Sequence, residues 1–422
     1  MVLLNWTKIS GGAKSALLLS TLFRIASATT LETSQQIFQD THIQTTPSTC
    51  LSKSSTIVDL VDCLDIFTVP PGFYTPESYD LAQPTPEELK GWNRTILNLL
   101  DLDVRQGPLN NARVGGWAYN ITDECTPVLL DASLKANFDV TTFTDRSTQR
   151  PFCVLYEHTI YTSQSSYVRG WGLFAVPLDS DPIFLLGYDY TITQPSSQAI
   201  HISAPHPQFD RGTPQQAAAV FGSPKVGAKS LLIAGRIRMA FKEKTGCIPS
   251  PKGMNYTKTD PAHDDAQPFF TASLSLYEWQ MAQGGCPPST CAFIQFHGKG
   301  PSTCPTDTMF LSTGLGMSSF RRNSSSWYTD SIDRPIKRLQ QNLKQVFPDW
   351  NATLPSDSTC SLVAANNIVG RFTNGIKPER VCREASNATL ATGQFIHIEQ
   401  APVARAAEVH EKWIEAIAAT FA

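Results

Sequence analysis

Three histidines each follow a short run with the character of a β-strand. His206 comes after Ala199–Ala204, His263 follows Thr259-Asp260-Pro261-Ala262, and His297 ends the apolar run Phe293–Phe296. Ligands of open α/β sheets bind at the carboxyl edge, where parallel strands end. We therefore expect the three side chains to meet in one polar site at that edge.

Histidine and carboxylate side chains in such an arrangement are typical zinc ligands. A catalytic zinc ion takes three protein N or O ligands and keeps one position for water. His206, His263 and His297 supply the nitrogens of the predicted set, with Asp260 or Asp210 as the acidic member. The H-E-x-x-H signature is absent. Asp260 also has a purely structural interpretation, as a cap ahead of Pro261, and buried histidines often serve only the core.

Two further side chains suit a hydrolytic site. Arg238 follows the apolar run Leu231–Gly235, and a guanidinium at a strand end matches the two oxygens of a substrate carboxylate. A salt bridge to a nearby acid explains it equally well. His397 and Glu399 share one face of a predicted strand at 395–399. Glu399 is the candidate general base, and His397 is an alternative metal ligand.

Other common chemistries lack their motifs. The chain has no G-x-S-x-G nucleophile elbow, no P-loop and no G-x-G-x-x-G after a strand. Its ten cysteines are even in number and show no C-x-x-C spacing, which favours disulfides over a zinc finger or a cysteine nucleophile. Neighbouring cysteines predict the pairs Cys50–Cys63, Cys286–Cys291 and Cys360–Cys382.

The elements that must position the site alternate between strands and helices. Strands are predicted at 153–161, 172–176, 199–204, 230–235, 292–296 and 395–399, and helices at 57–64, 86–100, 213–221, 269–283, 332–347 and 405–421. Thr85 and Glu88 form a predicted capping box, and Thr213 a predicted N-cap. The alternation indicates an α/β fold, three-layer with a largely parallel central sheet, preceded by a small disulfide-bonded N-terminal region.

Composition divides the chain into four parts. Residues 1–28 read as a signal peptide, with Lys8 and Lys14 before an apolar core and an A-x-A site at Ala26–Ala28. Residues 29–49 are predicted to be a flexible tail, 50–150 an α-rich N-terminal region, and 151–422 an α/β catalytic-like domain. We therefore expect a secreted, extracellular protein.

The surface is expected to carry N-linked glycans. Six N-x-[ST] sequons fall in the predicted mature chain, at Asn93, Asn120, Asn255, Asn323, Asn351 and Asn387. The formal net charge is −3 and no basic stripe is present, which argues against a nucleic-acid partner. No run after the leader is long and apolar enough to predict a membrane span.

The motifs P-H-P-x-x-D, L-L-I-A-G, T-D-P-A-H and Q-F-H-G together resemble a group of secreted fungal proteins. More distantly, residues 199–315 resemble zinc-dependent amidohydrolases of the N-formylglutamate amidohydrolase and poly-γ-glutamate hydrolase kind. The resemblance implies His206 and His297 as ligands, with Asp210 or Asp260 in the acidic position. The chain departs from the family in lacking the H-x-x-E spacing of the acidic ligand.

These observations predict a secreted metal-dependent hydrolase. Metal-activated water, with zinc as the expected ion, would cleave an amide bond near a carboxylate in a small-molecule or peptide substrate. A metal-dependent phosphoesterase would use the same residue types. A secreted binding or effector protein with a degenerate site is the non-enzymatic alternative.

Overall fold

The computed structural model describes residues 46–105, 125, 129–158, 169–178, 198–250, 255–315 and 324–422. The predicted signal peptide, residues 1–28, lies outside the described residues, as do residues 29–45 of the predicted tail. The first described helix, α2 (Pro47–Lys53), begins before residue 50. Asn120 and Asn323 also lie outside the described residues.

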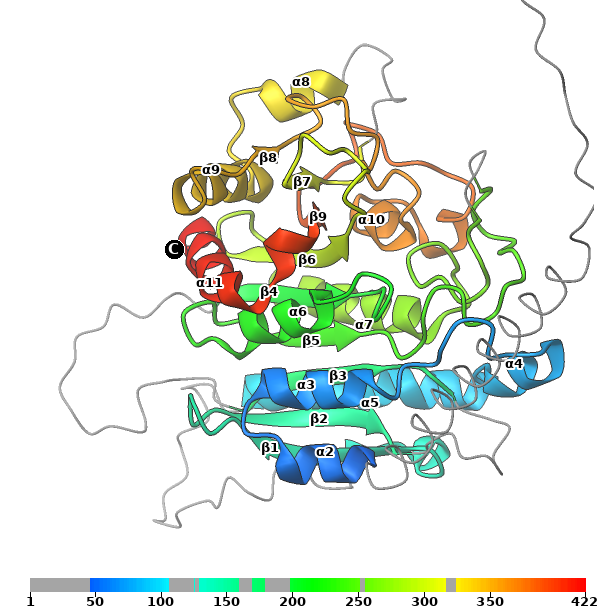
Figure 1. Cartoon of the computed structure of the whole chain (residues 1–422). Coiled ribbons are helices and arrows are strands. Elements are labelled where there is room, and N and C mark those ends of the chain that lie inside the picture. The colour runs from blue at the N-terminus through cyan, green and yellow to red at the C-terminus, as the bar shows by residue number, and fades with distance from the viewer. Residues whose placement is uncertain are drawn as a thin grey trace, which may run out of the picture.

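The described strands form one nine-stranded sheet that runs the length of the molecule (Figure 1). Its order, from one edge to the other, is β1 (Phe138–Thr144), β2 (Pro151–Glu157), β3 (Leu173–Pro177), β5 (Ser230–Ile233), β4 (Ala199–Ala204), β6 (Cys291–Gly298), β9 (Phe395–Gln400), β7 (Met309–Ser312) and β8 (Ala352–Thr353).

The centre of this sheet is parallel and its flanks are mostly antiparallel. Strands β5, β4, β6 and β9 pair in parallel. Strands β1, β2 and β3 form an antiparallel meander that joins β5, and β7 pairs antiparallel with β9. The predicted α/β class with a parallel central sheet is confirmed. Strand β1, from the predicted N-terminal region, belongs to the same sheet.

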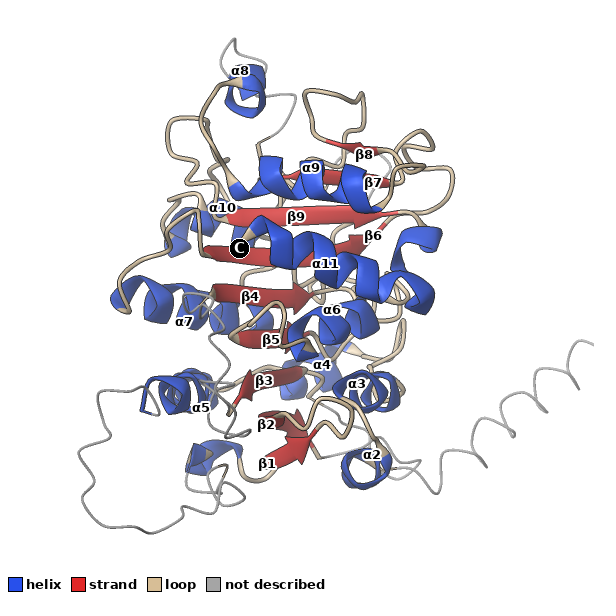
Figure 2. Cartoon of the chain, turned by 90° about the vertical axis from the view of Figure 1, so that its left-hand side faces the viewer, coloured by secondary structure: helices blue, strands red, loops and turns tan. Residues whose placement is uncertain are grey.

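Helices cover both faces of the sheet, giving three layers (Figure 2). One face carries α2, α3 (Ile57–Asp65), α6 (Thr213–Gly222), α9 (Pro335–Val346) and α11 (His410–Thr420). The other carries α5 (Pro86–Arg105), α7 (Pro268–Ala282) and α10 (Ile368–Thr373). The remaining described helices are α4 (Pro76–Ala82) and α8 (Ser324–Thr329), with 3-10 turns η4 (Ala132–Leu134), η7 (Pro378–Arg380), η8 (Pro402–Arg405) and η9 (Ala407–Val409).

Strand β6 shows why its sequence is continuously apolar. Ile294 and Phe296 enter the core on the α6 side, while Phe293 enters the core on the α7 side. A strand buried on both faces needs apolar residues at successive positions. The polar residues that interrupt this run, Gln295 and His297, are also buried, so they require partners inside the protein.

Of the two helix caps predicted from sequence, one is confirmed and the other is wrong. The predicted capping box of α5 is confirmed, since Thr85 N–H donates to Glu88 (2.8 Å) and Glu88 N–H donates to Thr85 Oγ1 (3.2 Å). The predicted N-cap at Thr213 is wrong. Gly212, with φ of 88°, precedes the helix, and Thr213 instead donates its hydroxyl to the carbonyl of Asp210.

Five disulfides join the ten cysteines. Two predicted pairs, Cys50–Cys63 and Cys286–Cys291, are confirmed, and the first lies in the N-terminal region. The predicted pair Cys360–Cys382 is wrong, because each cysteine reaches a partner brought near by the fold rather than by sequence. The remaining disulfides are Cys125–Cys153, Cys247–Cys382 and Cys304–Cys360.

Disulfides of this number are typical of proteins folded in an oxidising compartment. Among the helices of the described residues, none has the length and apolarity needed to cross a membrane.

Candidate functional site

The winding direction of the sheet reverses between β4 and β6. From β4 the chain moves through α6 to β5 on one side, whereas β6 lies on the other side of β4 and pairs with β9. Ligands of doubly wound sheets bind where the winding direction reverses in this way, outside the carboxyl ends of the strands. His206 follows β4 and His297 lies near the end of β6, so both histidines flank this point.

A single turn of backbone brings His206 and Asp210 together. Asp210 N–H donates to the carbonyl of His206 (2.9 Å), and Gln208 within this turn has a positive φ of 58°. The amide of Gln208 donates to the carbonyl of Asp65 (2.6 Å), which anchors the loop to the end of α3. The side chains of His206 and Asp210 are both buried.

Three side-chain atoms form a nearly equilateral triangle. His206 Nδ1 lies 3.1 Å from Asp210 Oδ2 and 3.2 Å from His297 Nδ1, and the remaining edge, from His297 Nδ1 to Asp210 Oδ2, is 3.5 Å. Tetrahedral zinc with bonds of about 2.0–2.1 Å separates its ligand atoms by about 3.3 Å. The three atoms therefore have the spacing of one face of a tetrahedral zinc site.

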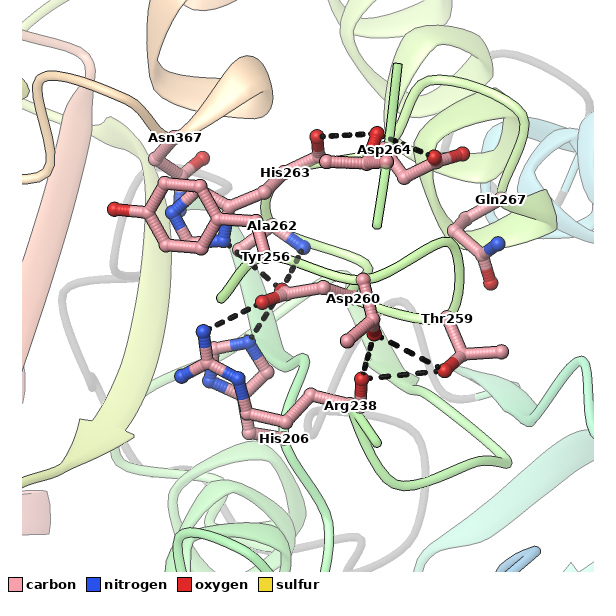
Figure 3. Close-up of polar contacts among 12 residues, drawn as sticks. His206, Arg238, Tyr256, Thr259, Asp260, Ala262, His263, Asp264, Gln267 and Asn367 are labelled. Atoms are coloured by element: carbon pink, nitrogen blue, oxygen red, sulfur yellow. Dashed lines mark hydrogen bonds and ion pairs between the residues drawn. The ribbon is translucent and has the colours of Figure 1, made fainter. Parts of the chain in front are cut away.

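The outward nitrogens of both histidines have acceptors. His206 Nε2 lies 3.0 Å from Asp260 Oδ1, and His297 Nε2 lies 2.8 Å from Gln295 Oε1. The other oxygen of Asp260 accepts from Arg238 Nη2 (2.6 Å; Figure 3). Asn367, the N-cap of α10, donates to Gln295. Metal-bound histidines usually donate their second N–H to such a group, which fixes the ring.

His263 approaches the site from beyond Asp260. Its Nδ1 is 3.0 Å from Asp260 Oδ1, and its ring stacks on Tyr256 with centroids 3.6 Å apart (Figure 3). His206, Asp260 and His263 form a second group whose ligand atoms lie close enough to hold a cation. Asp260 thus stands between His206 and His263.

Strand β9 adds a third group beside His297. His397 pairs with Gln295 and Glu399 with His297 in the β6–β9 register, and the two β9 side chains lie 3.6 Å apart (His397 Nε2 to Glu399 Oε1). The rings of His297 and His397 are 4.3 Å apart. The described residues provide no hydrogen bond to the Glu399 carboxylate, whose side chain is 13% exposed.

Electrostatics separate the histidines into charged and neutral. Burial disfavours charge on His206, but Asp210 and Asp260 outweigh burial and raise its pKa to about 9. Burial lowers the pKa of His297 to about 4 and that of His397 well below its usual value. For Asp210, burial is outweighed by His206, which holds its carboxyl pKa low.

The remaining acidic groups differ in the same way. Burial opposes ionisation of Asp260, yet His263, Arg238 and His206 hold its pKa well below the usual range. Burial, together with the charge of Asp210, raises the pKa of Glu399 to about 8. Asp260 is thus a permanent anion that holds three cationic or polar groups, while Glu399 is a carboxyl group that can exchange a proton near neutral pH.

The structure brings all the predicted site residues to one edge but gives them different neighbours. His206 and His297 belong to the triangle with Asp210, while Asp260, His263 and Arg238 form the arm behind His206. Arg238 makes the salt bridge to a nearby acid that was its alternative interpretation.

Two residues that support the ligands were not predicted from the sequence. Gln295 had a usable signal, since it stands two positions before His297 and faces the same way along the strand. Asn367 had none, because its role depends on α10 packing beside β6.

Comparison with known proteins adds no relative: no family model matches the chain, and neither a curated protein nor a solved structure matches it.

Proposed function

We propose that this protein is a metal-dependent hydrolase whose ion is held by His206, Asp210 and His297. The observation that carries the proposal is the triangle of ligand atoms with edges of 3.1, 3.2 and 3.5 Å. Two imidazoles and one carboxylate in tetrahedral spacing are suited to zinc. Three protein ligands leave a further coordination position for the reaction.

The groups behind the ligands support this assignment. Asp260 and Gln295 accept from the outward nitrogens of His206 and His297, so each Nδ1 faces the proposed metal position. Zinc would displace the Nδ1 proton of the charged His206. Arg238 holds Asp260 in place through the second carboxylate oxygen. We assign His263 to the Asp260 arm rather than to the ion itself, since its Nδ1 lies 3.0 Å from Asp260 Oδ1 and it is not grouped with Asp210 and His297.

A zinc ion in this position would supply an acidified water molecule and polarise a carbonyl group. Glu399 lies beside His297 without a hydrogen-bond partner among the described residues, and burial raises its pKa to about 8. A carboxyl group with a pKa near the working pH can take a proton from a nucleophile and return it to a leaving amine. We therefore assign Glu399 as the general base.

The substrate proposed is an amide next to a carboxylate, in a peptide or an acylated amino acid. Five disulfides accord with an extracellular setting, which we propose together with the leader at residues 1–28.

The test is the zinc content of the purified full chain and of three variants. Wild-type protein is expected to hold about one zinc per chain, while His206→Ala and His297→Ala lose it. The matched control is His158→Ala, because His158 is exposed and belongs to none of the three groups. Folding of each variant is checked by circular dichroism. If the folded wild-type protein takes up no added zinc, His206 and Asp210 form only a structural ion pair, and the proposal is contradicted.

A further inference from the structure

Arg405 lies at the carboxyl edge beside the triangle. It ends η8, the 3-10 turn that follows β9, and its carbonyl packs against Gly212 in the loop after His206. Its guanidinium lies over Gly298, the residue directly after His297, where any Cβ would overlap it. The chain therefore leaves space for this guanidinium by having glycine at 298.

The guanidinium of Arg405 has few partners. Nε and Nη1 are buried with no hydrogen-bond partner among the described residues, and Nη2 makes one long contact of 3.5 Å to the carbonyl of Lys299. A buried donor without a partner costs free energy, so such a group needs an explanation. The other arginine near the site, Arg238, already has a carboxylate partner in Asp260.

The charge of Arg405 interacts with two acids of the site without touching them. Burial lowers its pKa, and Asp210 and Glu399 act against that shift. Neither acid is within salt-bridge distance of Arg405 in the described structure. The positive charge is therefore present beside the site but is not neutralised by direct pairing.

We propose that Arg405 binds the carboxylate of the substrate. This inference rests on the proposed function and names the group that would place the scissile amide next to the metal ligands. Arginine matches a carboxylate because its planar fork donates to both oxygens. Nε and Nη1 are covered in the described conformation, so the guanidinium must turn away from Gly298 when the ligand enters.

The probe is levulinate, which has a carboxylate and replaces the amide nitrogen of acetylglycine with a carbon that cannot be cleaved. Its N-methylamide lacks the charge and serves as the control ligand. Calorimetric titration of zinc-loaded protein should show levulinate binding at least about tenfold more tightly than the amide, as expected for charged hydrogen bonds.

Two variants test the interaction in different ways. Arg405→Met should weaken levulinate binding by about 10- to 100-fold and leave amide binding unchanged. Gly298→Ala keeps the charge and pushes the guanidinium away from position 298, which is the movement that ligand entry requires; alanine is acceptable there because Gly298 lies in strand β6. It should bind levulinate at least as tightly as the wild type, and weaker binding with zinc retained would contradict that movement. Arg383→Met, an exposed arginine, is the control and should bind both ligands like the wild type.

Zinc content measured in every variant distinguishes this inference from the proposed function. Equal levulinate affinity in wild type and Arg405→Met, with zinc retained, would overturn the assignment of Arg405. If the wild type takes up no zinc, the proposed function fails, but loss of levulinate binding to Arg405→Met in metal-free protein would still support the carboxylate subsite. Tighter, Arg405-dependent binding of inorganic phosphate than of levulinate would overturn the carboxylate assignment in favour of a phosphate ester.

Discussion

His206 and Asp210 are joined by one closed turn of backbone, and their side chains meet at 3.1 Å between Nδ1 and Oδ2. The turn is anchored at both ends, by strand β4 before it and by α6 after it. Two ligands of the proposed metal are therefore held at their working separation by local structure, and only His297 must be supplied by another strand.

This relationship distinguishes the roles of the two aspartates. Asp210→Asn should lower zinc affinity by more than about 100-fold, because a neutral amide replaces the charged carboxylate ligand. Asp260→Asn should lower it by about 10- to 100-fold, the usual effect of changing a group behind a ligand. Competition with a chromogenic chelator measures both. The reverse order of effects would identify Asp260 as the ligand, with His206 and His263 completing the set.

Zinc binding should depend on pH through His206. Its pKa of about 9 means that the metal-free protein carries a proton on this imidazole at neutral pH. A metal ion needs the neutral ring, so binding below pH 9 releases that proton, and affinity should rise by about tenfold per pH unit up to that point. Calorimetry at pH 7 in buffers of different ionisation enthalpy counts the protons. Release of no proton would show that His206 is neutral before zinc binds.

Glycosylation should follow exposure. Asn255, Asn351 and Asn387 are exposed and are expected to be modified when the chain passes through a secretory pathway. Asn93 should stay bare, because its side chain accepts a hydrogen bond from α7 and Thr95 of its sequon is fully buried. Peptide mapping with and without a deglycosylating enzyme checks each position. Modification of Asn93 would mean that glycosylation precedes the docking of α5 against α7.

The parallel centre of the fold could be predicted because burial on both faces leaves a simple pattern. Strands β4, β5 and β6 appear as apolar runs, and His206 and His297 could be assigned to the site because they stand where those runs end. The choice between Asp210 and Asp260 could not be made from sequence. Both lie close to a histidine, and only the turn between His206 and Asp210 decides which oxygen completes the triangle.

Long-range geometry explains what the sequence did not predict. Arg405 was placed at the start of a helix at 405–421, but the chain forms two 3-10 turns there and α11 begins only at His410. Those turns carry Arg405 back towards Gly298. Likewise, Cys382 pairs with Cys247 across 135 residues, a contact that spacing cannot reveal.

The raised pKa of Asp65 predicts that the free energy of unfolding depends on pH, independently of the metal. It ends α3 and, with Glu157, lines a cavity of about 70 Å³ at the same edge of the sheet. Burial raises its pKa from 3.8 to about 6, against a stabilising hydrogen bond from Thr68, and the charge of Asp62 adds to the rise. A carboxylate at the end of a helix is also opposed by the helix dipole.

Because the folded protein holds this proton more tightly than the unfolded chain, wild-type stability should fall as pH rises from about 4 through about 6. Asp65→Asn keeps an acceptor for Thr68 but removes the charge. It should match the wild type near pH 4 and exceed its unfolding free energy by at most about 3 kcal/mol at pH 7.5. Urea unfolding at both pH values measures the difference, with Asp349→Asn, at an exposed position away from Asp65, as control. Lower stability of Asp65→Asn at pH 7.5 would show that the Asp65 carboxylate is stabilised, rather than opposed, by its surroundings.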